Sequence, residues 1–173
     1  MNLLQHFRSP SDTTYFNQGD TPVRECYEKK SKDDASLPEG ARPSMTLTFA
    51  QRSKSRGKAQ ASDDEPVAWF LERGHVMSDG EVLIANDGTQ VEIIAATEAA
   101  SEVRASTSEL ARAAYHLGNR HLAIQLGPDW VRYQRDHVID DMIASLGMQV
   151  MHVDEPFHPE AGAYSGGGHH HHD

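Results

Sequence analysis

Hydrophobic and polar residues alternate from Met45 to about Thr97, a pattern typical of β-strands with one buried face. Asn86-Asp87-Gly88 lies between two of the apolar segments, and these residue types tolerate the positive φ angles of a tight hairpin turn. The pattern therefore predicts a small N-terminal antiparallel β domain over residues 45–100. The apolar segments that carry it are 46–49, 67–71, 82–84 and 91–94.

Beyond Ser101 the pattern changes to strands that alternate with helices. Ser106 and Glu109 have the spacing of a capping box, which begins a first helix, and Asp136 can cap a second one. The predicted elements, caps included, are 103–105, 106–119, 121–126, 130–134, 136–147 and 150–153. Their order is β-α-β-β-α-β, so we expect an α+β protein with a ferredoxin-like domain over residues 101–164.

Both ends of the chain lack the apolar residues of a packed core. Residues 1–44 are rich in Ser, Asp, Lys, Gly and Pro, which predicts a weakly ordered segment. Residues 165–173 form a tail in which glycines precede four consecutive histidines. Neutral imidazoles bind nickel, copper and zinc, so the run is typical of a native metal-binding tail and equally of an affinity tag. The four histidines are His169, His170, His171 and His172.

Charge and cysteine content narrow the possible partners. The 16 basic and 26 acidic residues give a formal net charge of -10, which argues against a nucleic-acid partner and suits a cationic metal. Cys26 is the sole cysteine, which excludes a zinc site of several cysteines. The N-terminal apolar stretch is too short for a signal peptide and no later one is long enough to span a membrane. We therefore expect a cytoplasmic protein with no membrane partner.

Two further features concern function. The motifs H-E-x-x-H and G-x-S-x-G and a Gly-rich phosphate loop are missing from the sequence, so we do not expect an enzyme. The basic run over residues 52–58 is expected to be a solvated loop rather than a docking surface.

His121 begins the predicted strand 121–126, in which Leu122, Ile124 and Leu126 would face the core. His121 would then lie on the opposite face, open to solvent or to another subunit. In a twofold dimer, one such histidine per chain makes a site with two imidazoles. A hydrogen-bonded surface histidine is the alternative interpretation.

Two other histidines are candidate ligands. His137 begins the second helix, where the helix dipole favours a neutral imidazole that can bind metal, although capping or packing explains it equally well. His152, in the last predicted strand, lies within reach of a dimer axis. His158, just after that strand, also lies within plausible reach of a dimer axis, whereas His116 is predicted to be structural or solvated.

Three ordered segments resemble the UreE family of urease accessory proteins, which carry nickel: 115–121 (YHLGNRH), 136–142 (DHVIDDM) and 156–164 (PFHPEAGAY). Residues 47–56 also resemble the signature of that family's first domain. The resemblance implies a homodimer whose ferredoxin-like domains meet at a Ni(II) site around His121. It further implies contacts with the urease apoprotein and other urease accessory proteins, partly through the first domain.

Histidine-rich tails vary within that family, which favours a native tail whose histidines act as auxiliary ligands. Cu(II) and Zn(II) are expected to compete for imidazole ligands. The chain departs from the family pattern by the 44 residues that precede Met45. The alternative function is a non-catalytic docking module or a store of divalent metal.

Overall fold

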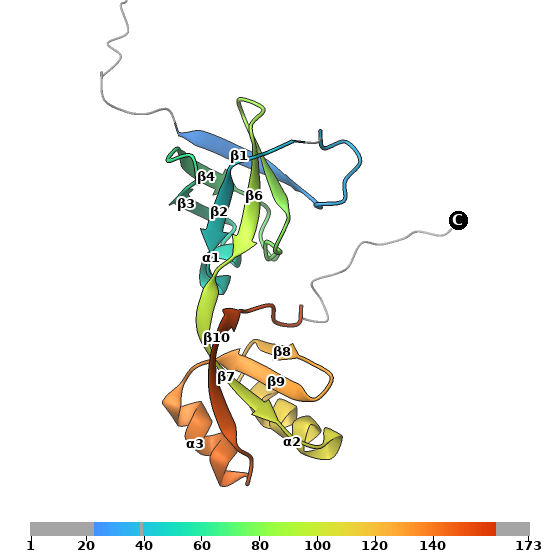
Figure 1. Ribbon diagram of the computed structural model, residues 1–173. Helices are drawn as coiled ribbons and strands as arrows, with labels where there is room; N and C mark the ends of the chain where they lie inside the picture. Colours follow the sequence, from blue (N-terminus) through green and yellow to red (C-terminus); the bar gives the residue numbers. More distant parts are fainter. Residues whose placement is uncertain (1–22, 39, 162–173) are drawn as a thin grey trace, which may run out of the picture.

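The computed structural model describes residues 23–38 and 40–161 of the chain. Its strands form two sheets, one in each half of the protein, and β6 (Gln90–Ala95) leads almost directly into β7 (Thr97–Arg104) to join the halves (Figure 1). The predicted α+β class is confirmed. Among the described residues, no helix has the length and apolar character needed to cross a membrane.

The N-terminal half is a six-stranded sheet with the order β2-β6-β5-β1-β4-β3. Its antiparallel pairs include β5 with β6, whose turn is made by Gly88 at a φ of 85°. The predicted antiparallel arrangement holds only in part, because β1 pairs in parallel with β4, and β2 with β6. The remaining strands are β1 (Arg24–Lys30), β2 (Ser44–Leu47), β3 (Arg56–Gln60), β4 (Pro66–Phe70) and β5 (Val82–Ala85).

Strand β1 lies inside the segment that the sequence predicts to be weakly ordered, and it occupies the interior of the sheet between β5 and β4. Its Cys26 is fully buried in the core, whereas most of its other side chains are charged. A strand with one buried residue has little hydrophobic signal of its own. Its stability comes from the two strands that flank it.

The core of this half surrounds Trp69, whose indole nitrogen donates a hydrogen bond to the Lys54 carbonyl oxygen at 2.8 Å. Gly57 on β3 pairs with Trp69, and a Cβ atom added there would lie 2.2 Å from the indole ring. Position 57 therefore accepts only glycine without a shift of the ring.

The basic run over residues 52–58 is not the solvated loop that the sequence predicts. Strand β2 ends at Leu47, Thr48 caps the short helix α1 (Phe49–Arg52), and β3 begins at Arg56. Arg52 itself is 2% exposed, because its guanidinium donates hydrogen bonds to two main-chain carbonyl groups far away in sequence.

The C-terminal half has the element order β-α-β-β-α-β, as the sequence pattern predicts, and a sheet with the strand order β10-β7-β9-β8. Ser106 and Glu109 form the capping box of the first helix, and Asp136 caps the second, as predicted. Strand β7 already starts at Thr97, so this sheet begins before the predicted boundary. The other elements are α2 (Thr107–Gly118), β8 (Ile124–Leu126), β9 (Trp130–Gln134), α3 (His137–Ser145) and β10 (Val150–Pro156).

The segment after β10 connects the two halves. Phe157 is fully buried and its ring meets Phe49 edge to face, with 5.4 Å between the centroids. Its carbonyl oxygen accepts a hydrogen bond from Arg52 Nη2 at 2.5 Å, while Nη1 of Arg52 donates to the Met77 carbonyl oxygen at 3.0 Å. A second contact joins Glu98 to the main-chain N–H of Phe49 at 2.6 Å.

Candidate metal-binding residues

His121 lies in the turn that follows α2, not in a strand, which corrects the sequence prediction. Its main-chain N–H donates to the Gly118 carbonyl oxygen at 2.9 Å, so these residues continue the helical turn, and strand β8 begins only at Ile124. The predicted apolar face also fails at Leu126, which is 49% exposed. The hydrogen bonds at the end of α2 therefore determine the conformation of His121, rather than the alternation of apolar residues from which the strand was predicted.

The backbone of His121 has a φ of 56°, in the left-handed region that few non-glycine residues adopt. Its side chain is exposed, and no side-chain hydrogen bond of the described residues involves its ring. Nearby in sequence, Tyr115 on α2 is 65% exposed and its ring meets that of His116 edge to face. The turn thus presents an imidazole with both nitrogens free of protein partners within the described part of the chain.

His137 is the first residue of α3, and its side chain is exposed. The cap of this helix is Asp136, whose carboxylate accepts from the N–H groups of Val138 and Ile139 at 2.8 and 3.4 Å. Capping therefore does not require His137, and its role as a ligand stays a prediction.

His152 on β10 is held by a carboxylate. Its Nε2 lies 2.8 Å from Asp140 Oδ2, and the Tyr133 hydroxyl donates to Asp140 Oδ1, also at 2.8 Å. Burial alone would raise the pKa of Asp140, but the hydrogen bonds with His152 and Tyr133 bring it below its ordinary value. A carboxylate that fixes one imidazole nitrogen leaves the other free for a metal, as around many metal-binding histidines.

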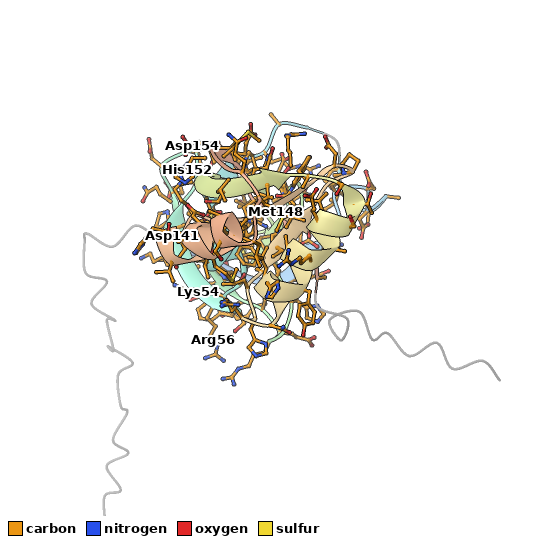
Figure 2. All side chains as sticks on the ribbon, turned by 90° about the horizontal axis from the view of Figure 1, so that it is seen from below. Lys54, Arg56, Asp141, Met148, His152 and Asp154 are labelled. Atoms are coloured by element: carbon orange, nitrogen blue, oxygen red, sulfur yellow. The ribbon has the colours of Figure 1, made fainter. Side chains whose placement is uncertain are left out.

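Figure 2 shows His152 and Asp154 side by side on β10, with Asp141 on α3 further along the same side. Asp154 lies 3.4 Å from Arg135, which competes with a metal for its carboxylate. In residues 23–38 and 40–161, no group of three or more His, Cys, Asp or Glu side chains is placed to hold a metal ion. The structure therefore does not join His121, His137 and His152 into one site within a single chain.

The predicted tail ligands lie outside the described residues, and Cys26, which was not predicted to be a ligand, is unsuitable as one. His169, His170, His171 and His172 fall outside the described residues. Burial raises the pKa of the Cys26 thiol to about 11, so it stays protonated and is a poor metal ligand.

A pocket of about 460 Å³ between the two halves was not predicted from the sequence. Phe49, His75 and Val76 line it from the N-terminal half, and His158 and Glu160 from the segment after β10. The lining residues of the N-terminal half and those of the segment after β10 are at least 80 positions apart and belong to no common motif, so only the fold reveals the pocket.

The fold and the exposed histidines define a two-domain α+β protein with imidazole groups on its C-terminal domain. Two family models match it: the UreE urease accessory protein N-terminal domain over residues 28–96 and the C-terminal domain over residues 98–173. The chain belongs to the UreE urease accessory protein family.

Individual relatives support this assignment. The chain is 49% identical over 132 residues to the urease accessory protein UreE of Cupriavidus pinatubonensis, a match that covers 76% of this chain and 60% of the relative. It is 49% identical over 127 residues to UreE of Teredinibacter turnerae, covering 73% of this chain and 82% of the relative. The chain thus spans less than two thirds of the first of these proteins and more than four fifths of the second.

Proposed function

We propose that this protein is a urease accessory nickel metallochaperone, which binds Ni(II) through His121 at a dimer interface and delivers it to the apo-urease assembly complex. Membership of the UreE family supports a role in urease maturation. The observation that carries the metal assignment is the exposed His121 imidazole, which has no side-chain hydrogen bond to any described residue.

Symmetry supplies the second half of such a site. Two copies related by a twofold axis through the His121 turn contribute two imidazoles from one position. Exposed apolar side chains on the same domain, Tyr115 at 65% and Leu126 at 49%, are suitable for a subunit interface. The tail histidines act in this proposal as auxiliary ligands.

The chemistry of imidazole suits delivery rather than storage. Neutral imidazole binds nickel well, but copper binds such ligands more strongly and zinc competes, so selectivity comes from geometry, partner and metal supply. A site with few protein ligands also releases its ion more readily than a closed cage. The ion is cargo here, and the protein contributes ligands that an acceptor protein can replace.

A calorimetric titration with NiCl₂ tests the assignment. The His121→Ala variant should lose the tightest site, which we expect at one ion per dimer, while His75→Ala, which removes another exposed histidine on the N-terminal domain, should keep it. An intact tight site in His121→Ala would refute the role of His121. Sedimentation of both variants without metal checks that the dimer is unchanged.

A second variant separates the tail from the central site. Deletion of residues 166–173 should reduce the number of ions bound and leave both the dimer and the tightest site in place, because a Gly-rich segment supplies ligands and no core. Dissociation of the metal-free dimer on this deletion would contradict the proposal.

A further inference from the structure

Two exposed histidines line the pocket of about 460 Å³ between the two halves. His75 lies in the connection between β4 and β5, and His158 lies in the segment after β10, which returns to the junction of the halves (Figure 1). Neither ring takes part in a side-chain hydrogen bond or an ion pair among residues 23–38 and 40–161. Both imidazoles are therefore available to a ligand of the pocket.

A single guanidinium group holds the main chains of these two segments close together. Arg52 donates to the carbonyl oxygens of Met77 and Phe157 at 3.0 and 2.5 Å. Since the two donor nitrogens belong to one rigid planar group, the two oxygens lie no more than about 8 Å apart. Met77 is two positions after His75, and Phe157 directly precedes His158. The fold thus brings two histidines that are distant in sequence to one pocket.

The charges around the pocket suit a cation. Glu160 also lines the pocket, and its side chain is exposed. Burial lowers the pKa of Arg52, while Glu98 and Asp79 raise it, so two carboxylates offset its positive charge. Three carboxylates against one guanidinium leave a net negative charge near the pocket, which favours a metal ion over an anion.

We propose that His75 and His158 bind one divalent transition-metal ion between the two halves, at a site separate from His121. Imidazole binds copper, nickel and zinc, and Cu(II) binds most strongly of these divalent ions. No group of three or more His, Cys, Asp or Glu side chains of the described residues is placed to hold an ion, so two imidazoles are the protein ligands and water completes the coordination. A bound water can donate a hydrogen bond to Glu160.

The two imidazoles need only small adjustments to share an ion. Metal–nitrogen distances of about 2.0–2.1 Å require the two ligating nitrogens to lie within about 4 Å of each other. Exposed side chains change rotamer within nanoseconds, so both rings can turn towards a common ion in the pocket. A bound ion then links the segment after β10 to the N-terminal half, beside the hydrogen bonds of Arg52.

Two independent surface histidines would behave differently. Each would bind its own ion through a single nitrogen, and each substitution would remove a different ion. A shared ion predicts that either substitution removes the same ion, together with any spectrum that reports two nitrogen ligands.

The test uses a full-length background that lacks the other predicted ligands of the central site and the tail. Its substitutions are His121→Ala, His169→Ala, His170→Ala, His171→Ala and His172→Ala. The probe is CuCl₂, because the electron paramagnetic resonance spectrum of Cu(II) reports its nitrogen ligands. We expect one Cu(II) ion per chain that is bound more tightly than any other and has two coordinating nitrogens.

Variants in this background locate the ion. His75→Ala and His158→Ala should each weaken the binding of that ion at least about tenfold and remove the two-nitrogen spectrum. His137→Ala, which removes an exposed histidine on α3 outside the pocket, should leave affinity and spectrum unchanged. Circular dichroism of each variant should match the background, since all three side chains are exposed.

Three results would overturn the proposal: no such Cu(II) ion in the background, an equal loss in His137→Ala, or the loss of a different ion in each of the two pocket variants. The outcome is independent of the nickel assignment, because the background has no His121. Absence of Cu(II) binding there would overturn the interdomain site and leave the assignment of His121 untouched. Binding of Cu(II) would support the interdomain site even if His121→Ala alone kept its tightest nickel site.

Discussion

Replacing Arg52 with methionine should destabilise the protein, because this side chain connects the two halves. Its two hydrogen bonds reach the carbonyl oxygens of Met77 and Phe157, one in each half. Hydrogen bonds to charged groups contribute about 1.5–3 kcal/mol each, so the loss of both would cost about 3–6 kcal/mol. Methionine fills much of the same volume but leaves the two carbonyl groups without these donors.

Part of that loss is offset. Burial lowers the pKa of Arg52, whereas Glu98 and Asp79 raise it. The buried positive charge therefore costs the folded protein some free energy of unfolding. Methionine removes this cost. We therefore expect the free energy of unfolding to fall by about 2–4 kcal/mol, a large share of the 5–15 kcal/mol typical of a small protein.

Urea unfolding followed by tryptophan fluorescence measures this change, because Trp69 reports on the N-terminal sheet and Trp130 on the C-terminal sheet. A Trp130→Phe background isolates the first signal. The control is Arg73→Met, which alters an exposed arginine and should change stability by less than about 0.5 kcal/mol. If Arg52→Met were as mild as the control, or more stable than the parent, the importance of the two hydrogen bonds would be refuted.

Three further outcomes follow from the packing and the ligand chemistry. Gly57→Ala should lower the free energy of unfolding by about 1–3 kcal/mol, since its Cβ would lie 2.2 Å from the Trp69 ring; unchanged stability in urea would contradict this contact. Tyr133→Phe should cost about 0.5–1.5 kcal/mol by removing the hydroxyl bonded to Asp140, and calorimetric melting would show no shift if that bond were unimportant. Imidazole must be neutral to bind metal, so the nickel affinity of the tail-deleted protein should be high near pH 7 and fall towards about pH 5; a constant affinity would exclude histidine ligands.

Local signals in the sequence predicted much of the fold. The capping residues of both long helices and the Gly88 turn depend on neighbours within four positions, so a single sequence contains the necessary information. The order β-α-β-β-α-β follows from these boundaries. Strand β1 escaped prediction because most of its residues are charged and only Cys26 is fully buried, so its pairing with β4 and β5 determines its structure.

The candidate site was less predictable. Alternation of apolar residues placed His121 in a strand, whereas the turn after α2 takes up residues 119–122 and sets a left-handed backbone at His121. Its exposure follows from this turn, and its role as a ligand stays a prediction. Arg52 belongs to a basic run that is typical of surface loops, but carbonyl groups 25 and 105 positions away account for its burial. Such distant partners leave no periodic signal.

The short segment after β10 couples the C-terminal half to the N-terminal half more closely than the two-domain pattern suggests. Phe157 accepts a hydrogen bond from Arg52, while the N–H groups of His158 and Glu160 donate to Gln125 and Ile124 at 3.0 and 2.8 Å. The segment that contacts α1 through Phe157 therefore also contacts β8, the strand that follows the His121 turn, through His158 and Glu160. A substitution in this segment should therefore disturb both the interdomain contact and the His121 turn, because no described helix or strand lies between that turn and β8.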